Sequence, residues 1–208
     1  CSTLRAVACT GIGLTAKDGS HILSRTIEWS RGELKSEYVI IPRGHRITSY
    51  TPTGTNGLTF TARYGVVGLS VEMEDFLAEG INEAGLSAGL FFFPHYGSYP
   101  SYDPEQNERT VADLQLVAWI LTQFSSIDQV KKTLPSIRVA GLEPSSVVHW
   151  RIGEPSGRQV VLEIVGGEAH FYENPVGVLT NAPGFPWHLT NLNNYVNLFP
   201  GDAPRQQL

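Results

Sequence analysis

The chain has 208 residues, of which 41% are hydrophobic and 17% are charged. This length and composition predict one folded domain with a sizeable core and exclude a disordered chain. The formal net charge is −5 and the charges are interspersed, so we expect no basic surface for nucleic acid or anionic lipid. No apolar run reaches the roughly 18 residues that a membrane-spanning helix needs.

The two cysteines, Cys1 and Cys9, both lie near the N-terminus, where they would close only a small loop. Reactive or inert thiols are therefore the open interpretations. Residues 6–8 are Ala, Val and Ala, the small-residue pattern that signal peptidase recognises before a cleavage site. We therefore expect residues 1–8 to be a leader or pro-segment, residues 9–208 to be the domain, and the mature protein to be periplasmic or secreted rather than cytoplasmic. Two alternatives stay open: Cys1 is itself a mature, lipidated end, or the tripeptide occurs by chance.

The first half of the chain predicts β-strands. Two strand-like runs, residues 9–16 and 21–29, flank the residues Lys17, Asp18, Gly19 and Ser20, and an Asp-Gly pair between such runs is a strong hairpin signal. Further runs of strand-forming residues cover 37–44, 58–73 and 85–93. The last of these is so apolar that we expect it to be buried on both faces.

The periodicity changes in the middle of the chain. Apolar residues at three- and four-residue spacing between Thr110 and Phe124 predict an amphipathic helix, and residues 126–134 predict a second short helix that Pro135 ends. Strand patterns then return at 145–153, 158–165, 169–174 and 176–180. The last part, residues 187–199, is predicted to be helical or irregular. These elements indicate one α+β domain with its helices grouped in the middle.

Three patterns that can carry chemistry fit their context poorly. Gly85, Ser87 and Gly89 match the G-x-S-x-G turn of α/β-hydrolases, but the residues up to Pro94 cannot begin the helix that this turn needs. A papain-like pair of a cysteine with a distant histidine agrees with the spacing, although such a cysteine normally lies at a helix N-terminus and Cys9 opens a strand. We expect no metal site, because the six histidines lack zinc-ligand spacing: His21, His45, His95, His149, His170 and His188.

An N-terminal nucleophile is the remaining interpretation of Cys9. An unperturbed α-amine has a pKa of about 7.7 to 8.0, so it exchanges a proton near neutral pH and lies within reach of its own side chain. A Cys9 freed by cleavage after Ala8 would supply both the base and the nucleophile. No cofactor is needed for this chemistry.

Three blocks of the sequence resemble the choloylglycine hydrolase family, which includes bile salt hydrolases and penicillin V acylases. The stretch "CTGIGLTAKDGSHILSRTIEW" is similar to the family's opening, with its N-terminal Cys, its K-D-G turn and its R-x-x-D motif. "EGINEAGLSAGLFFFP" is similar to the D-G-x-N-E-K-G-L block, and "GVLTNAPGFPWHLTNLNNY" to the L-T-N-x-P block. The resemblance implies an α+β fold of the αββα N-terminal nucleophile hydrolase type, a sandwich of two antiparallel sheets.

The resemblance also implies roles for individual residues. Cys9 would be the nucleophile, Arg25 would favour its thiolate form, and Glu28 would accept a hydrogen bond from the α-amine. Asn181 and the backbone N–H of Phe92 would donate to the oxyanion. For both Arg25 and Glu28 to reach the site, the strand must end or bulge near Thr26.

We interpret Asn82 and Gly85, although they match a family block, as turn residues, and we assign Lys17 and Asp18 to the hairpin. Aromatic walls suit a large apolar acyl group, and we expect these residues to line the substrate site: Trp29, Phe60, Tyr64 and Phe91.

Three departures from the family pattern affect the interpretation. Phe92 stands where bile salt hydrolases commonly carry Asn and penicillin V acylases Tyr, so this position does not choose between the two substrates. Glu28 stands where most members carry Asp. The chain also ends at "FPGDAPRQQL", so we expect the C-terminal part of the family fold, with its active-site Arg, to be absent from it.

The function that the resemblance implies is hydrolysis of glycine- or taurine-conjugated bile acids. The alternatives are a penicillin V acylase-type amidase, and a precursor or fragment that only binds ligand. The expected partner is a small-molecule substrate, with no nucleic acid and no membrane, and we expect a homo-oligomer.

Overall fold

The computed structural model describes residues 9–28, 34–143, 147–196 and 198. The predicted leader, Trp29 and residues 199–208 lie outside the described residues. Within the described part, no helix is both long and apolar enough to cross a membrane.

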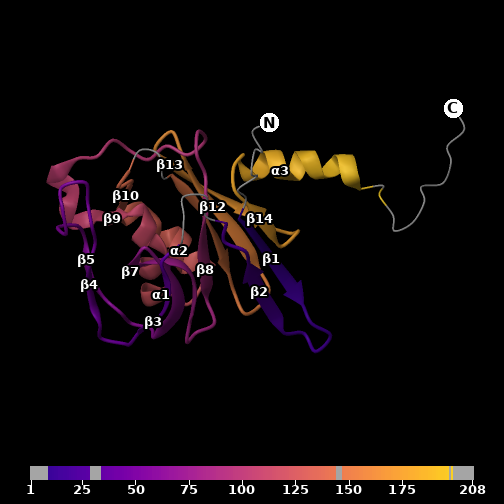
Figure 1. The fold of residues 1–208 in the computed structure, drawn as a ribbon, viewed down its shortest axis with the longest axis horizontal. Helices are drawn as coiled ribbons and strands as arrows, with labels where there is room; N and C mark the ends of the chain where they lie inside the picture. The colour runs from indigo at the N-terminus through magenta and orange to yellow at the C-terminus, as the bar shows by residue number, and fades with distance from the viewer. Residues whose placement is uncertain (1–8, 29–33, 144–146, 197, 199–208) are drawn as a thin grey trace, which may run out of the picture.

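A seven-stranded antiparallel sheet forms the centre of the fold (Figure 1). Its strands lie in the order β13-β12-β11-β8-β7-β6-β3. In chain order they are β3 (Ser36–Ile41), β6 (Val66–Val71), β7 (Met73–Asn82), β8 (Ser87–Phe92), β11 (Val148–Gly153), β12 (Gln159–Val165) and β13 (Glu168–Glu173). The strands β8, β11 and β12 are buried over most of their length, as expected for near-continuous apolar runs. Ser87 lies inside β8 with no helix after it, which confirms that the G-x-S-x-G match is not a nucleophile turn.

A second, three-stranded antiparallel sheet contains the predicted N-terminal hairpin. Its order is β14-β1-β2, with β1 (Thr10–Thr15), β2 (His21–Arg25) and β14 (Val178–Thr180). The hairpin turn is as predicted: the Asp18 carboxylate accepts hydrogen bonds from the N–H and the hydroxyl of Ser20 at 3.0 and 2.6 Å, and Gly19 has a φ of +86°. The predicted turn role of Asn82 is also confirmed, because its Oδ1 accepts from the N–H groups of Ala84 and Leu86.

The predicted helix over 110–124 is only partly correct. The helix α1 spans Leu116–Gln123. Before it, β9 (Thr110–Ala112) pairs in parallel with β10 (Arg138–Ala140), and a 3-10 turn covers Asp113–Gln115. Tertiary hydrogen bonds override the helical periodicity here, since the Ala112 N–H donates to Ser49 Oγ at 2.9 Å and the Ser49 hydroxyl donates to Gln115 Oε1 at 2.8 Å.

The remaining elements are short. The second predicted helix is α2 (Ile127–Thr133), and Pro135 lies in the 3-10 turn that follows it. Near the C-terminal end, α3 (Phe185–Leu192) matches the expected helical segment. The others are β4 (Arg46–Thr48) and β5 (Thr59–Thr61), which pair antiparallel, and the 3-10 turns η1 (Pro104–Arg109), η3 (Leu134–Ser136) and η4 (Asn193–Tyr195).

The elements stack in layers. The helix α1 packs against β7 and β8 on one face of the large sheet, and the three-stranded sheet packs on the opposite face (Figure 1). The two sheets approach so closely that a Cβ at Gly11 would lie 2.6 Å from Phe91 Cζ and 2.7 Å from Arg151 Nη1. Two antiparallel sheets face to face, with helices outside, are the predicted sandwich.

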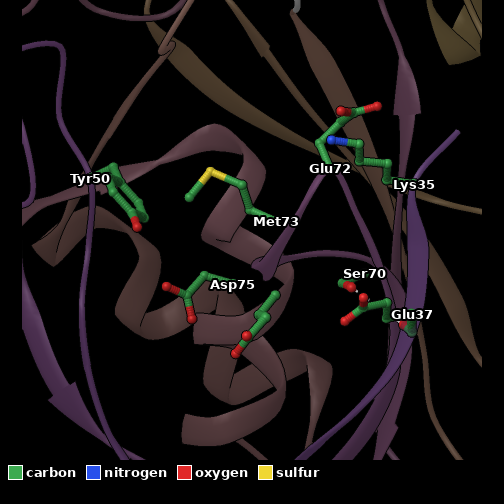
Figure 2. Close-up of a pocket in the computed structure, with 8 residues that line it drawn as sticks. Lys35, Glu37, Tyr50, Ser70, Glu72, Met73 and Asp75 are labelled. Atoms are coloured by element: carbon green, nitrogen blue, oxygen red, sulfur yellow. Dashed lines mark hydrogen bonds between the residues drawn. The ribbon is translucent and has the colours of Figure 1, made fainter.

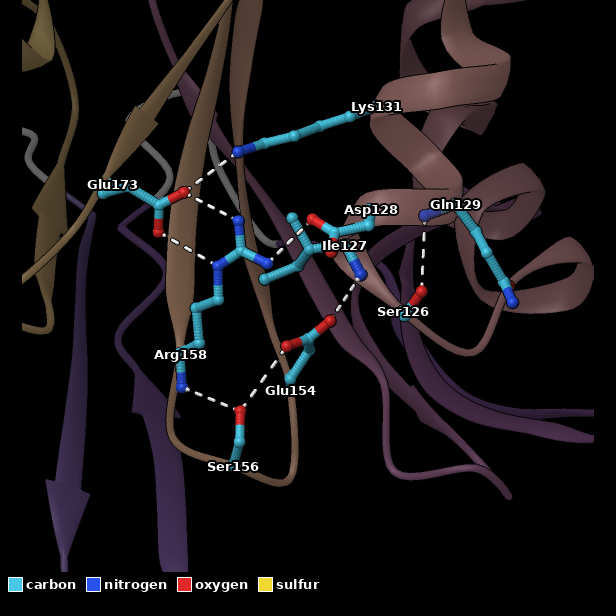
Figure 3. Close-up of polar contacts among 9 residues, drawn as sticks. All are labelled: Ser126, Ile127, Asp128, Gln129, Lys131, Glu154, Ser156, Arg158 and Glu173. Carbon is cyan, nitrogen blue, oxygen red and sulfur yellow. Dashed lines mark hydrogen bonds and ion pairs between the residues drawn. The ribbon is translucent and has the colours of Figure 1, made fainter.

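Ion pairs join α2 to the edge of the large sheet (Figure 3). The guanidinium of Arg158 donates two hydrogen bonds to the Glu173 carboxylate, at 3.1 and 2.8 Å, and a third to Asp128 at 2.8 Å. Lys131 of α2 also contacts Glu173, at 2.9 Å. This arrangement lowers the pKa of Glu173 to about 2, because the carboxylate accepts hydrogen bonds from both cations.

Candidate active site

Cys9 lies immediately before β1, between the two sheets. It is buried, with 8% of its surface exposed, and packs with Phe91, Leu179 and Phe185. The carbonyl oxygen of Cys9 accepts a hydrogen bond from the Thr180 hydroxyl at 2.7 Å. The register of β1 and β14 pairs Thr10 with Thr180, so the next position of this ladder brings Cys9 beside Asn181.

Arg25 ends β2 opposite Gly11 in the register, and its side chain fills the space between the sheets. Its Nη1 donates to the carbonyl oxygens of Leu90 and Ala78 at 2.5 and 3.0 Å, and its guanidinium lies 4.3 Å above the centre of the Phe91 ring. Burial lowers the pKa of Arg25, while Glu79 and a hydrogen bond with the Cys9 side chain act in the opposite direction. The structure therefore places the Arg25 guanidinium beside the Cys9 side chain, and its role in favouring the thiolate stays a prediction.

Glu28 follows the end of β2, so the strand does end near Thr26 as the sequence required. Its Oε2 is buried, and no other group in the described part of the chain donates a hydrogen bond to it. An unpaired buried carboxylate oxygen is costly. This atom is an unused acceptor three residues after Arg25.

Asn181 follows β14 and is buried, with 8% exposed. Its Oδ1 accepts a hydrogen bond from the Phe92 N–H at 3.0 Å, and the Ala182 N–H donates to Phe92 O at 3.0 Å. The structure thus joins the two predicted oxyanion donors to each other. In this conformation the Phe92 N–H already has an acceptor, so it would have to change partner to reach an oxyanion, and that role stays a prediction.

The aromatic residues that were predicted to line the substrate site do not lie together in the structure. Phe91 is fully buried beneath Arg25, and Phe60 is buried in the main core together with residues of α1. Tyr64 is half-buried, and its N–H donates to Thr122 O. Packing accounts for Phe60, and the structure does not bring Phe60 or Tyr64 together with Cys9. The fourth residue, Trp29, lies outside the described residues.

Sequence reasoning missed two charged residues beside Arg25. Arg151, 1% exposed, donates from Nη2 to Glu79 Oε1 at 3.0 Å, and Arg25 Nη1 lies 3.8 Å from Glu79 Oε2. Burial raises the pKa of Glu79, whereas the two arginines act to lower it. When ionised, these three side chains carry one net positive charge behind the thiol, which favours an anion there.

Two hollows are lined by residues on and around β2, β3, β6 and β7. A cleft of about 930 Å³ runs between β2 and the uncovered face of β3, β6 and β7, with Arg25, Ile27, Glu79, Tyr38 and Ile81 in its lining. Arg25 therefore connects the thiol to an open cleft. A smaller hollow of about 460 Å³ is lined by Tyr50, Met73, Asp75 and other residues, none of them a predicted site residue (Figure 2). Among the residues that the structure describes, no three His, Cys, Asp or Glu side chains are grouped to hold a metal ion.

The sequence is similar to proteins of known activity. The family model of linear amide C–N hydrolases, choloylglycine hydrolase family, matches residues 9–208. The chain is 32% identical over 209 residues to the bile salt hydrolase/transferase of Clostridium perfringens, covering 96% of this chain and 61% of that protein. It is 28% identical over 194 residues to the bile salt hydrolase/transferase of Bifidobacterium longum, covering 90% and 59%.

Solved structures share the fold. A crystal structure of a mutant conjugated bile acid hydrolase from Clostridium perfringens aligns with a TM-score of 0.79 and 30% identity, over 96% of this chain and 61% of that one. Penicillin V acylase from Agrobacterium tumefaciens aligns with a TM-score of 0.78 and 21% identity, over 92% and 58%. The predicted fold class is therefore confirmed. The chain spans about three-fifths of the length of these proteins.

Proposed function

Because the chain belongs to the choloylglycine hydrolase family of linear amide C–N hydrolases, we propose that it hydrolyses glycine- or taurine-conjugated bile acids with Cys9 as the nucleophile. The observation that carries this proposal is the contact of the buried Cys9 side chain with Arg25, which also lines a cleft, at a register position beside Asn181. The names of the similar proteins supply the substrate class.

The proposed reaction has two steps. The thiolate of Cys9 attacks the amide carbonyl carbon, and the positive charge of Arg25 stabilises the thiolate. The C–N bond breaks, the leaving glycine or taurine nitrogen takes a proton from the α-ammonium of Cys9, and a thioester remains. Water then hydrolyses the thioester, which releases the bile acid and restores the thiol. The side-chain amide of Asn181 stabilises the oxyanion in both steps.

The mechanism needs a free amine at Cys9, and we propose cleavage of the chain after Ala8. The family match begins at residue 9, and the buried Glu28 Oε2 is an acceptor that the freed amine could use. Because the cleavage motif is that of signal peptidase, we propose a periplasmic or secreted enzyme. We also propose that it forms a homo-oligomer, which light scattering of the purified protein tests.

The test combines intact mass with an activity assay. The full chain is expressed with residues 1–8, and the mass shows whether it begins at Cys9. Release of glycine from glycocholate and of taurine from taurocholate is then measured for the wild type, for Cys9→Ala and for Cys1→Ala as the matched control. We expect release from the wild type and from Cys1→Ala, and none from Cys9→Ala. Equal release from Cys9→Ala would refute the nucleophile assignment, and a mature chain that releases neither amine would refute the function.

A penicillin V assay tests the alternative amidase. The likeness to penicillin V acylase is one of fold, so we expect turnover of penicillin V to be slower than that of the bile acid conjugates. The opposite ranking would favour the alternative.

A further inference from the structure

A buried histidine and a buried glutamate lie behind the segment that carries Asn181. His149 of β11 is 0% exposed and Glu163 of β12 is 2% exposed. His149 Nδ1 and Glu163 Oε1 are 3.1 Å apart. Burying a polar pair costs free energy unless each of its polar groups forms a hydrogen bond. The hydrogen-bond partners of His149 and Glu163 therefore indicate the role of the pair.

Both residues bind the backbone of residues 180–185. His149 Nε2 lies 2.9 Å from Thr180 O, and because a carbonyl oxygen only accepts, Nε2 carries the hydrogen. At the other end of the segment the Phe185 N–H donates to Glu163 Oε1 at 2.7 Å. Asn181 lies between these two anchors.

The pair is itself held in one orientation. The imidazole of His149 stacks on Phe93 with ring centres 4.4 Å apart and planes 3° apart, and it meets the edge of Phe91 at 6.3 Å. Thr180, which His149 holds through its carbonyl, also donates its hydroxyl to Cys9 O at 2.7 Å. A short chain of contacts therefore runs from the pair through Thr180 to both Asn181 and the backbone of Cys9.

We propose that His149 and Glu163 are positioning residues that set the distance between Asn181 and the carbon attacked by Cys9. The inference rests on the proposed function, because only an oxyanion donor needs this placement. Removal of one such donor typically costs on the order of 10² to 10³ in kcat, and small misplacements of reacting groups also lower rates steeply. If the pair merely stabilised the core, its loss would lower the stability of the protein without a selective effect on kcat.

The test begins with His149→Phe, which keeps the stacking on Phe93 and removes both hydrogen bonds. We expect kcat for glycocholate to fall by roughly 10- to 100-fold with KM within about threefold, as for partial loss of one donor. Glu163→Gln keeps an acceptor for the Phe185 N–H and should stay within about threefold of the wild type. His45→Phe, at an exposed position just before β4, is the matched control and should leave kcat unchanged. If His149→Phe does not fold, Glu163→Leu removes the second anchor, at the Phe185 N–H, and should lower kcat in the same way.

A double-mutant cycle with Asn181→Ala separates positioning from general damage. If the pair acts through Asn181, adding His149→Phe to Asn181→Ala should lower kcat by less than about twofold more. Losses that multiply in full, or a change confined to KM, would overturn the proposal.

Hydrogen exchange of the 180–185 amides gives a readout that does not need activity. We expect His149→Phe to raise exchange there and to leave the amides of β6 and β7 unchanged; unchanged exchange in 180–185 would overturn the positioning role. A wild type without turnover would count against the proposed function, while exchange would still decide the positioning.

Discussion

Replacing Asp113 by asparagine should change how the stability of the protein depends on pH. Asp113 is 0% exposed in the turn before α1, and its Oδ1 accepts from the Leu114 N–H at 2.9 Å. Burial raises the pKa of Asp113 from its ordinary value of 3.8 to about 7, although the hydrogen bond from Leu114 opposes this. The folded protein therefore retains a proton that the unfolded chain releases above about pH 4.

The sign and size of the effect follow from this difference. The stabilising contribution of the proton is complete below about pH 4 and is lost as the pH rises through about 7. At about 1.4 kcal/mol per pH unit, the full effect is roughly 4 kcal/mol. Asparagine mimics the neutral carboxyl group at every pH, so Asp113→Asn should become more stable relative to the wild type as the pH rises.

Urea unfolding followed by circular dichroism at pH 4, 5.5, 7 and 8 measures this trend. The free energy of unfolding of Asp113→Asn minus that of the wild type should increase by several kcal/mol from the first pH to the last. Asp18→Asn is the control, because hydrogen bonds from Ser20 lower the pKa of that exposed carboxyl group and its trend should be small and opposite. A difference for Asp113→Asn that does not change with pH would refute the reasoning.

Three further changes have measurable outcomes. Gly11→Ala should lower the free energy of unfolding in urea by about 1 to 3 kcal/mol and reduce turnover, because the new Cβ would meet the opposite sheet. Gly65→Ala is the control: its Cβ would meet no atom nearer than 3.7 Å, so stability and turnover should stay unchanged. Asn82→Ala should lower the free energy of unfolding by about 2 to 4 kcal/mol, because its amide binds four backbone groups; an unchanged melting temperature would contradict this. Arg158→Met should remove at most about 1 kcal/mol above pH 4.5, and the difference should vanish as the pH falls towards the pKa of Glu173, about 2.

Local signals in the sequence were sufficient for much of the fold. The Asp-Gly turn, the apolar strand β8 and the short helix α2 each depend on neighbours in the chain, and each prediction is confirmed. The helix prediction over 110–124 was wrong in its first half, because the side chains that hold that segment extended come from Ser49 and Gln115, which meet only in the folded chain.

The candidate site residues came from the family resemblance, and their roles stay predictions. Cys9, Arg25 and Asn181 stand in recognisable blocks, and the structure brings them together. The pairs formed by Glu79 with Arg151 and by His149 with Glu163 join residues on different strands, so no spacing rule reveals them. The available signal was an ionisable side chain inside an otherwise apolar strand, which is rarely tolerated without a partner.

The ladder between β1 and β14 has a consequence for how this chain tolerates change. Thr10 lies opposite Thr180, so strand pairing aligns Cys9 with Asn181, and a shift by one residue would turn Asn181 towards the other face of its sheet. Insertions or deletions in the turn before Val178 should therefore be far more harmful than substitutions at cleft positions such as Leu23 and Tyr38. Under the proposed function, variation in substrate choice is expected at these positions and not at Arg25 or Glu79, because a new side chain at Leu23 or Tyr38 leaves the alignment of thiol and amide intact.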